Sequence, residues 1–172
     1  ELGAESKIIR SKNDYATQNL EITETDRLSD YTYDIDIHSA YATFGQKFNK
    51  FSYQLGARFE SYKAQANLNN GKVKFDDEYL TLYPSAYLTY THNEKNMFQF
   101  SYSRRVDRPS LEQTKPIREF STPLTTAIGN PELEPQFTNS MEVNYTKMFA
   151  NNSSFTAGVF YRIVNNEINR VF

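Results

Sequence analysis

The sequence contains no cysteine and no tryptophan, and it has only six glycines and six prolines in 172 residues. Without cysteine, a disulfide framework and a thiolate metal site are excluded, and nothing indicates the redox compartment. No run of about 18 apolar residues is present, which excludes transmembrane helices. No secretory signal peptide is visible, because Glu1 stands in a polar, strand-like stretch. We therefore expect a piece of a longer protein whose export signal lies upstream.

Signals for catalysis and for nucleic-acid binding are also lacking. The formal net charge of -2 argues against nucleic-acid binding, which normally leaves a basic excess. No Ser/His/Asp relay, P-loop or GxGxxG motif is present, so we expect neither an enzyme nor a bound cofactor. The two histidines, His38 and His92, have no cysteine to accompany them, and a zinc site is not expected.

Aromatic residues, by contrast, are abundant, with 13 Tyr and 13 Phe. Aromatic side chains suit a pleated, half-buried surface and favour strands over helices. The mean hydropathy is -0.70, with 38% hydrophobic residues. This low value is compatible with a membrane β-barrel, because only every second residue of a barrel strand faces lipid.

Very short and very long links alternate between the strand-like segments of the sequence. Each of the six clearest segments spans about 11 to 14 residues, and a tilted strand needs about 9 to 11 to cross a bilayer. The segments are residues 35–48, 51–64, 80–91, 97–107, 137–149 and 154–165, with 1–10 as a seventh. The short links are 49–50, 92–96 and 150–153, and the long polar loops are 11–34, 65–79 and 108–136. Outer-membrane barrels alternate short periplasmic turns with longer extracellular loops in the same way.

Apolar and polar residues alternate within these segments. In residues 51–64, one face carries Tyr53, Leu55, Ala57 and Phe59, and the other carries Gln54, Gly56, Arg58 and Glu60. A helix would instead repeat at spacings of three and four. We predict an all-β antiparallel up-and-down meander, a partial transmembrane β-barrel formed as a single domain over residues 1–172. The facing of 35–48 stays open, because Phe44 and Phe48 share a face with Asp36 and His38.

The same alternation describes a soluble β-sandwich. Aromatic residues favour the barrel, since pairs such as Phe48 and Phe51 or Tyr90 and Phe98 flank the short links, where barrels carry aromatic girdles. Structureless loops longer than about 12 to 15 residues are also uncommon in compact soluble domains.

Residues 83–145 carry three motifs: Tyr83-Pro84-Ser85, the stretch SYSRRVDRPS at 101–110, and GNPELEPQFTNSME at 129–142. In this order they resemble the barrel domain of Bacteroidetes TonB-dependent receptors, and LGARFE at 55–60 is similar to another strand of that family. The resemblance implies a Gram-negative outer-membrane barrel of about 22 strands with a plugged lumen, of which this chain supplies about seven to eight. No plug domain and no TonB-contact segment lies in these residues.

The resemblance implies part of a receptor that imports a scarce nutrient such as a chelated metal, a glycan or a peptide. Its partners would be outer-membrane lipid, the plug domain and TonB system, and a nutrient ligand whose identity the sequence does not reveal. A small self-contained barrel of structural or adhesin type is the alternative, and a soluble β-sheet binding module is the second alternative.

Candidate contact residues follow from the alternation. Arg58, Glu60, Arg105, Asp107 and Arg162 are expected on the lumen face, in reach of a plug or substrate. Arg104 interrupts the lipid face near the outer end of its segment, where its guanidinium would suit a lipid A phosphate. The alternative for Arg104, Arg105, Asp107 and Arg108 is a local ion network that fixes the start of the long loop.

Two acidic groups are candidate cation sites. Asp34, Asp36 and His38 share one strand face, and Asp76, Asp77 and Glu78 are consecutive. Hard cations need more oxygen ligands than either group offers, so we expect a polar lumen face for the first group. For the second we expect a solvated acidic loop, and no metal site is predicted.

Overall fold

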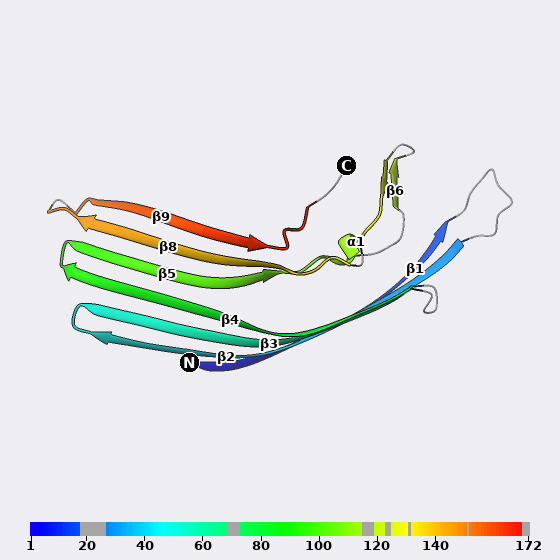
Figure 1. The fold of residues 1–172 in the computed structure, drawn as a ribbon, viewed down its shortest axis with the longest axis horizontal. Helices are drawn as coiled ribbons and strands as arrows, with labels where there is room; N and C mark the ends of the chain where they lie inside the picture. Colours follow the sequence, from blue (N-terminus) through cyan, green and yellow to red (C-terminus); the bar gives the residue numbers. More distant parts are fainter. Residues whose placement is uncertain are drawn as a thin grey trace. The chain divides into compact units, whose positions relative to one another are not determined.

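The computed structural model describes residues 1–17, 27–68, 73–114, 119–122, 125–130, 132–150 and 152–169. Seven strands form one sheet in the order β1-β2-β3-β4-β5-β8-β9, in which sequence neighbours pair along most of the sheet (Figure 1). Their bounds are β1 Leu2–Thr17, β2 Arg27–Phe48, β3 Phe51–Leu68, β4 Val73–Asn93, β5 Asn96–Asp107, β8 Gln136–Met148 and β9 Ser154–Asn165. The predicted all-β meander is confirmed, and the sheet is open, with β1 and β9 at its edges.

The chain divides into two compact units. The first unit contains Glu1–Leu2, Tyr41–Arg58 and Leu82–Phe172, and the second contains Gly3–Ala40 and Phe59–Thr81. Strands β1, β2, β3 and β4 contribute residues to both units, so the boundary runs across strands and not through a linker.

Strand pairing in the first unit fixes which residues share a face, because residues directly opposite each other in a sheet point the same way. One row across β4, β5, β8 and β9 is Leu88, Phe100, Val143 and Val159. A second row is Ser85, Ser103, Ser140 and Arg162. We call the face of the first row the apolar face and the face of the second row the polar face.

Three tight turns join β2 to β3, β4 to β5 and β8 to β9, and all three lie at the same end of the first unit (Figure 1). Asn49 adopts a positive φ of 46°, which asparagine tolerates better than most residues. In the second turn the Asn93 side-chain oxygen accepts hydrogen bonds from the Lys95 backbone N–H at 3.0 Å and the Asn96 amide at 2.8 Å. The positive φ of Asn49 and the bonds to Asn93 stabilise the first two of these turns.

In the direction of the strands, each of these turns extends beyond the turn before it. The backbone N–H of Thr91, before the end of β4, donates to the carbonyl of Lys50 in the first turn at 2.7 Å. The N–H of Met148, the last residue of β8, donates to the carbonyl of Lys95 in the second turn, also at 2.7 Å. The tips of successive hairpins are therefore stepped.

Four aromatic rings form a continuous row on the apolar face beside the turns. The ring centroids of Phe51 and Tyr90 lie 4.5 Å apart, those of Tyr90 and Phe98 6.4 Å apart, and those of Phe98 and Tyr145 4.9 Å apart. We call these four residues the aromatic row. Its place matches the aromatic girdle expected near the short links.

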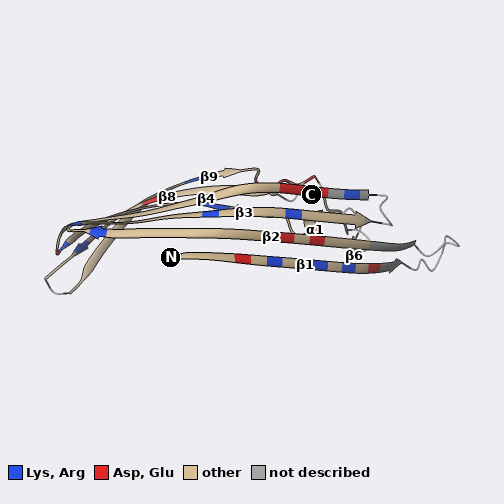
Figure 2. Cartoon of the chain, turned by 90° about the horizontal axis from the view of Figure 1, so that it is seen from below, with Lys and Arg blue, Asp and Glu red and all other residues tan. Residues whose placement is uncertain are grey.

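The second unit corrects two predicted loops. Residues 11–17, 27–34, 65–68 and 73–79, expected in loops 11–34 and 65–79, belong to β1, β2, β3 and β4, while 18–26 and 69–72 lie outside the described residues. Polar cross-strand contacts extend the β3–β4 hairpin: Lys63 pairs with Glu78 at 3.4 Å, and Gln65 donates to Asp76 at 3.4 Å. Figure 2 shows the charged bands along β1, β2 and β3.

The third predicted loop, 108–136, also contains regular structure. Helix α1 covers Leu111–Thr114, and strands β6 (Glu119–Thr122) and β7 (Thr125–Ala127) form a small hairpin. Ser110 and Gln113 form a capping box, since the Ser110 backbone N–H donates to the Gln113 side chain at 2.8 Å and Ser110 Oγ accepts from the Gln113 N–H at 3.4 Å. In the described part of the chain, no helix is long and apolar enough to span a membrane.

Candidate functional site

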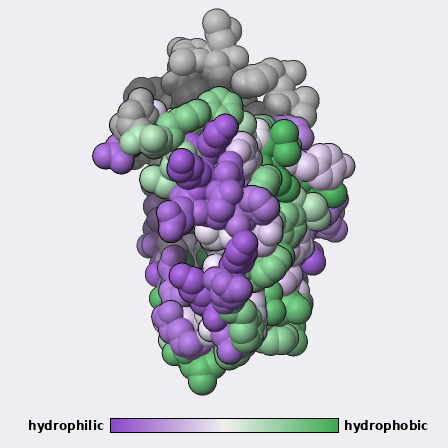
Figure 3. Space-filling view, turned by 90° about the vertical axis from the view of Figure 1, so that its left-hand side faces the viewer, coloured by the Kyte–Doolittle hydropathy of each residue, from purple (hydrophilic) through white to green (hydrophobic). Residues whose placement is uncertain are grey.

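The two faces of the sheet present different chemistry, with hydrophobic residues gathered along one side and hydrophilic residues along the other (Figure 3). On the polar face of the first unit, β5, β8 and β9 enclose a shallow groove of about 390 Å³. Its lining residues are Ser101, Ser103, Arg105, Ser140, Met141, Glu142, Phe160, Tyr161 and Arg162. We call it the serine–arginine groove. Short serine side chains between longer charged ones create the hollow.

Positive charge dominates the serine–arginine groove. Arg105 and Arg162 are exposed, and no ion pair of either is recorded among the described residues. Glu142 is the one carboxylate in the lining, and it accepts a hydrogen bond from the Asn144 amide at 2.8 Å. Guanidinium groups flanked by hydroxyls suit an anionic or hydroxyl-rich ligand, or a carboxylate from another protein segment.

The predicted lumen residues separate into two groups. Arg105 and Arg162 come together in the groove, although they are far apart in the sequence. Asp107 is exposed at the end of β5, where it pairs with Gln136 along the backbone, and it is not part of the lining. Arg58 is half-buried in the first unit, and Glu60 is buried in the second, at 4% exposure. Alternation alone places the lining serines on the polar face of their strands, but the register between strands decides that they meet in one groove with Phe160.

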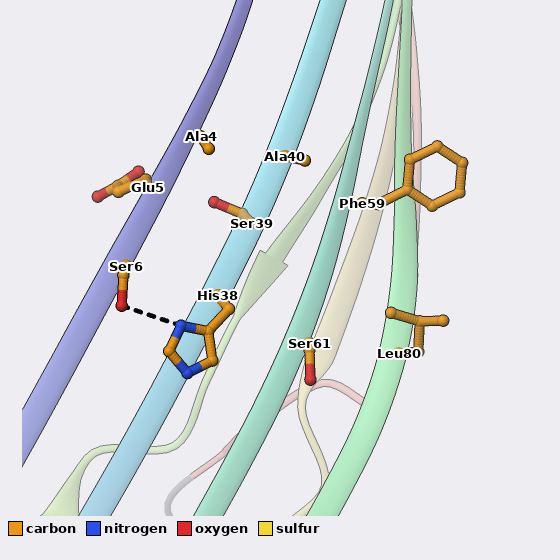
Figure 4. A pocket seen from close by; sticks show the side chains of 9 residues that line it. All are labelled: Ala4, Glu5, Ser6, His38, Ser39, Ala40, Phe59, Ser61 and Leu80. Atoms are coloured by element: carbon orange, nitrogen blue, oxygen red, sulfur yellow. Dashed lines mark hydrogen bonds between the residues drawn. The ribbon is translucent and has the colours of Figure 1, made fainter.

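A second groove lies in the second unit, with a volume of about 540 Å³. Small residues of β1, β2 and β3 form its floor, and Phe59 and Leu80 stand at one side (Figure 4). The remaining lining residues are Ala4, Glu5, Ser6, His38, Ser39, Ala40 and Ser61. His38 Nδ1 and Ser6 Oγ are 2.9 Å apart. The expectation that His38 lies on a polar lumen face is wrong, because it lines a groove with the exposed hydrophobic residues Phe59 and Leu80.

The carboxylates near His38 form ion pairs with an arginine of the same chain. Arg10 contacts Asp36 at 2.6 Å and Asp34 at 3.9 Å. Among the described residues, no group of three His, Asp or Glu side chains is arranged to hold a metal ion. Asp76 and Glu78 belong to β4 and pair with β3 side chains, so the predicted acidic loop is also wrong.

Arg104 projects from the apolar face, opposite Asn139 on β8. Its guanidinium carbon lies 4.8 Å from the centre of the Phe137 ring. The predicted local ion network does not form around Asp107, which has no ion pair in the described residues, while Arg108 donates to the Tyr83 hydroxyl at 3.4 Å. Adjacent strand residues point to opposite faces, which separates Arg104 from Arg105 and Asp107.

Comparison with known proteins decides the family. Residues 1–172 match the outer membrane protein beta-barrel family along the whole chain. The chain belongs to that family. This membership agrees with the open antiparallel meander and indicates localisation in the outer membrane. No curated protein matches the chain.

Members of this family reside in a bilayer, which β-strands can span only as a closed sheet, because every backbone polar group must be paired there. For such a barrel we expect the apolar face of the first unit, with its aromatic row, to meet lipid. We expect the polar face, with the serine–arginine groove, to line the lumen.

Proposed function

We propose that this chain is part of the barrel of a TonB-dependent outer-membrane receptor that imports a scarce nutrient, such as a chelated metal, a glycan or a peptide. The observation that carries the proposal is the serine–arginine groove on the polar face. The motifs at 101–110 and 129–142 add the resemblance to such receptors.

The groove supports a wide lumen. In a barrel of about eight strands, inward side chains fill the interior. Here Ser101, Ser103 and Ser140 are short, and Arg105 and Arg162 are exposed with no ion pair recorded in the described strands. Such a wall suits a lumen that contains water and a plug domain, as in large outer-membrane transporters.

The proposed partners are outer-membrane lipid on the apolar face, and a plug domain, the TonB system and the nutrient on the other side of the wall. The protein is proposed to bind and transport, and to catalyse no reaction. Arg105 and Arg162 are the proposed contacts for plug or cargo, with Arg58, Glu60 and Asp107 as further lumen candidates.

Uptake measurements test this function. A strain lacking the gene is compared with the same strain expressing the wild-type protein, across chelated metals, glycans and peptides, with and without the proton-motive force that drives TonB. We expect energised uptake of one nutrient class to be lost and restored. Unchanged uptake of all classes would contradict the proposal.

The alternative of a small structural or adhesin barrel predicts a different result. A self-contained barrel would refold in detergent from residues 1–172 alone and would show heat-modifiable gel migration. The second alternative, a soluble binding module, predicts a detergent-free monomer, and the family assignment gives it no support.

A further inference from the structure

Arg104 is the one charged side chain on a large part of the apolar face. From the aromatic row to the far ends of the paired parts of β4, β5, β8 and β9, every other described residue on that face is uncharged. Its neighbours there include Tyr102, Val106 and Met141. Arginine stays protonated in proteins, so this face carries a permanent positive charge at one point.

The guanidinium has no anionic partner within the described chain. Arg104 Nε is buried and has no hydrogen-bond partner there, and no carboxylate lies within ion-pair distance. The Phe137 ring, 4.8 Å away, holds the group against the sheet through a cation–π contact. The side chain is therefore held in place while its hydrogen-bonding capacity is not fully used.

Asn139 adds a second donor beside Arg104. The two residues are directly opposite each other on β8 and β5. The Tyr102 hydroxyl donates to Asn139 Oδ1 at 3.0 Å, which leaves the amide Nδ2 of Asn139 as a donor. A guanidinium and an amide N–H without a carboxylate beside them form a site for an oxyanion.

The height of Arg104 in the bilayer identifies the source of that oxyanion. At about 3.4 Å per residue, about 20 Å of β5 separates Arg104 from Phe98 in the aromatic row. With a strand tilt of about 35–45°, this rise is about 15 Å of an apolar band about 25 Å tall. A long arginine side chain spans much of the remaining distance by snorkelling. The short turns mark the periplasmic side, so the headgroups within reach are those of the outer leaflet.

We propose that Arg104 and Asn139 bind the phosphate of a phosphorylated lipid in the outer leaflet of the outer membrane. The phosphate accepts hydrogen bonds from the guanidinium and from the Asn139 amide. The acyl chains of the lipid lie along the apolar face. The assignment does not depend on the transport proposal, because it needs only a barrel in the outer membrane.

The test uses the complete protein purified from outer membranes in mild detergent. Native mass spectrometry counts retained phosphorylated lipid for the wild type, Arg104→Gln and the matched control Arg105→Gln, whose side chain lies on the opposite face. We expect retention to fall about tenfold or more in Arg104→Gln and to stay at the wild-type level in Arg105→Gln. The three proteins are then stripped of lipid, and the same lipid without its phosphate is added back. None of the three proteins should retain it.

Two further variants keep the result interpretable if Arg104→Gln folds poorly. Arg104→Lys retains the charge without the planar fork and should retain lipid at an intermediate level, and Asn139→Leu should lose several-fold. Equal retention in wild type and Arg104→Gln, or equal losses in Arg104→Gln and Arg105→Gln, would overturn the site. Saturation by inorganic phosphate with no preference for phosphorylated lipid would show a free-phosphate site and overturn the lipid assignment.

Discussion

A charged side chain meets different surroundings on the two faces of the sheet, and single residues reveal this difference. Phe100 and Val159 belong to the row that meets lipid, and Val159 is 69% exposed. Ser101, next to Phe100, lines the serine–arginine groove instead. A charge at the first two positions must enter hydrocarbon, whereas a charge at Ser101 meets water or protein.

Lysine substitutions should therefore separate the faces. Leu55→Lys, Phe100→Lys and Val159→Lys should each destabilise the folded barrel by about 2 to 4 kcal/mol near the bilayer centre. Gln54→Lys and Ser101→Lys should leave folded yield in the membrane near wild type. The measurement is the heat-modifiable folded fraction in outer membranes, and equal damage at Leu55 and Gln54 would contradict the membrane facing.

Gly158→Lys is a poor test of facing. A Cβ at Gly158 would meet the side-chain oxygen of Asn144 across the β8–β9 pair, so the Asn144 amide, which donates to Glu142, must turn away. A lower folded yield of Gly158→Lys would therefore reflect the local contact with Asn144 and would not show which face meets lipid.

Asn49 tests the role of backbone conformation in the first turn. Its φ of 46° is costly for a β-branched residue, by about 1–2 kcal/mol, and is easy for glycine. Asn49→Val should lower the urea midpoint of unfolding, while Asn49→Gly should leave it close to wild type. Equal midpoints for the two variants would mean that the turn conformation adds nothing to stability.

Among the elements, the aromatic row is the clearest case of side chains linking neighbouring strands. Phe98 and Tyr145 pair directly, with ring centroids 4.9 Å apart. A double-mutant cycle to alanine should give a coupling energy of about 0.5–1.5 kcal/mol. The control cycle, Ser103 with Ser140 on the other face, should give a coupling near zero. Equal couplings would show that the ring contact contributes nothing specific.

Periodicity predicted some elements well and others poorly, for physical reasons. Strand β9 runs over Ser154–Asn165, as predicted, and β5 starts one residue earlier than predicted, because both alternate between apolar and polar residues. The extensions of β3 and β4 are held by polar pairs such as Lys63 with Glu78, and such pairs look like loop sequence until the register is known. Helix α1 did have a readable signal, the capping box from Ser110 to Gln113.

The candidate site was predictable only in part. Alternation assigned Arg105 and Arg162 to one kind of face, but their meeting in one groove depends on how β5, β8 and β9 are registered. A single strand contains no information about register beyond the face it buries. The facing of residues 35–48 was open for a different reason, because Phe44 and Phe48 share a face with Asp36 and His38.

At the scale of the whole molecule, the unpaired edges govern behaviour in isolation. In the described sheet, β1 and β9 each pair with one strand only. Such edges are templates for association with other strands. Residues 1–172 refolded alone in detergent should form oligomers, measured by light scattering after size-exclusion chromatography. A monodisperse monomer would contradict this and favour a self-contained barrel.

The stepped hairpin tips have a geometric consequence for the complete barrel. The hydrogen bonds from Thr91 to Lys50 and from Met148 to Lys95 correspond to an offset of about one residue per strand, which sets the shear of a closed barrel. For a given strand number, shear fixes the radius, and an offset of this size matches strand inclinations of about 35–45°. The radius of the barrel is thus encoded in part in the turns at one rim, far from the groove that lines its wall.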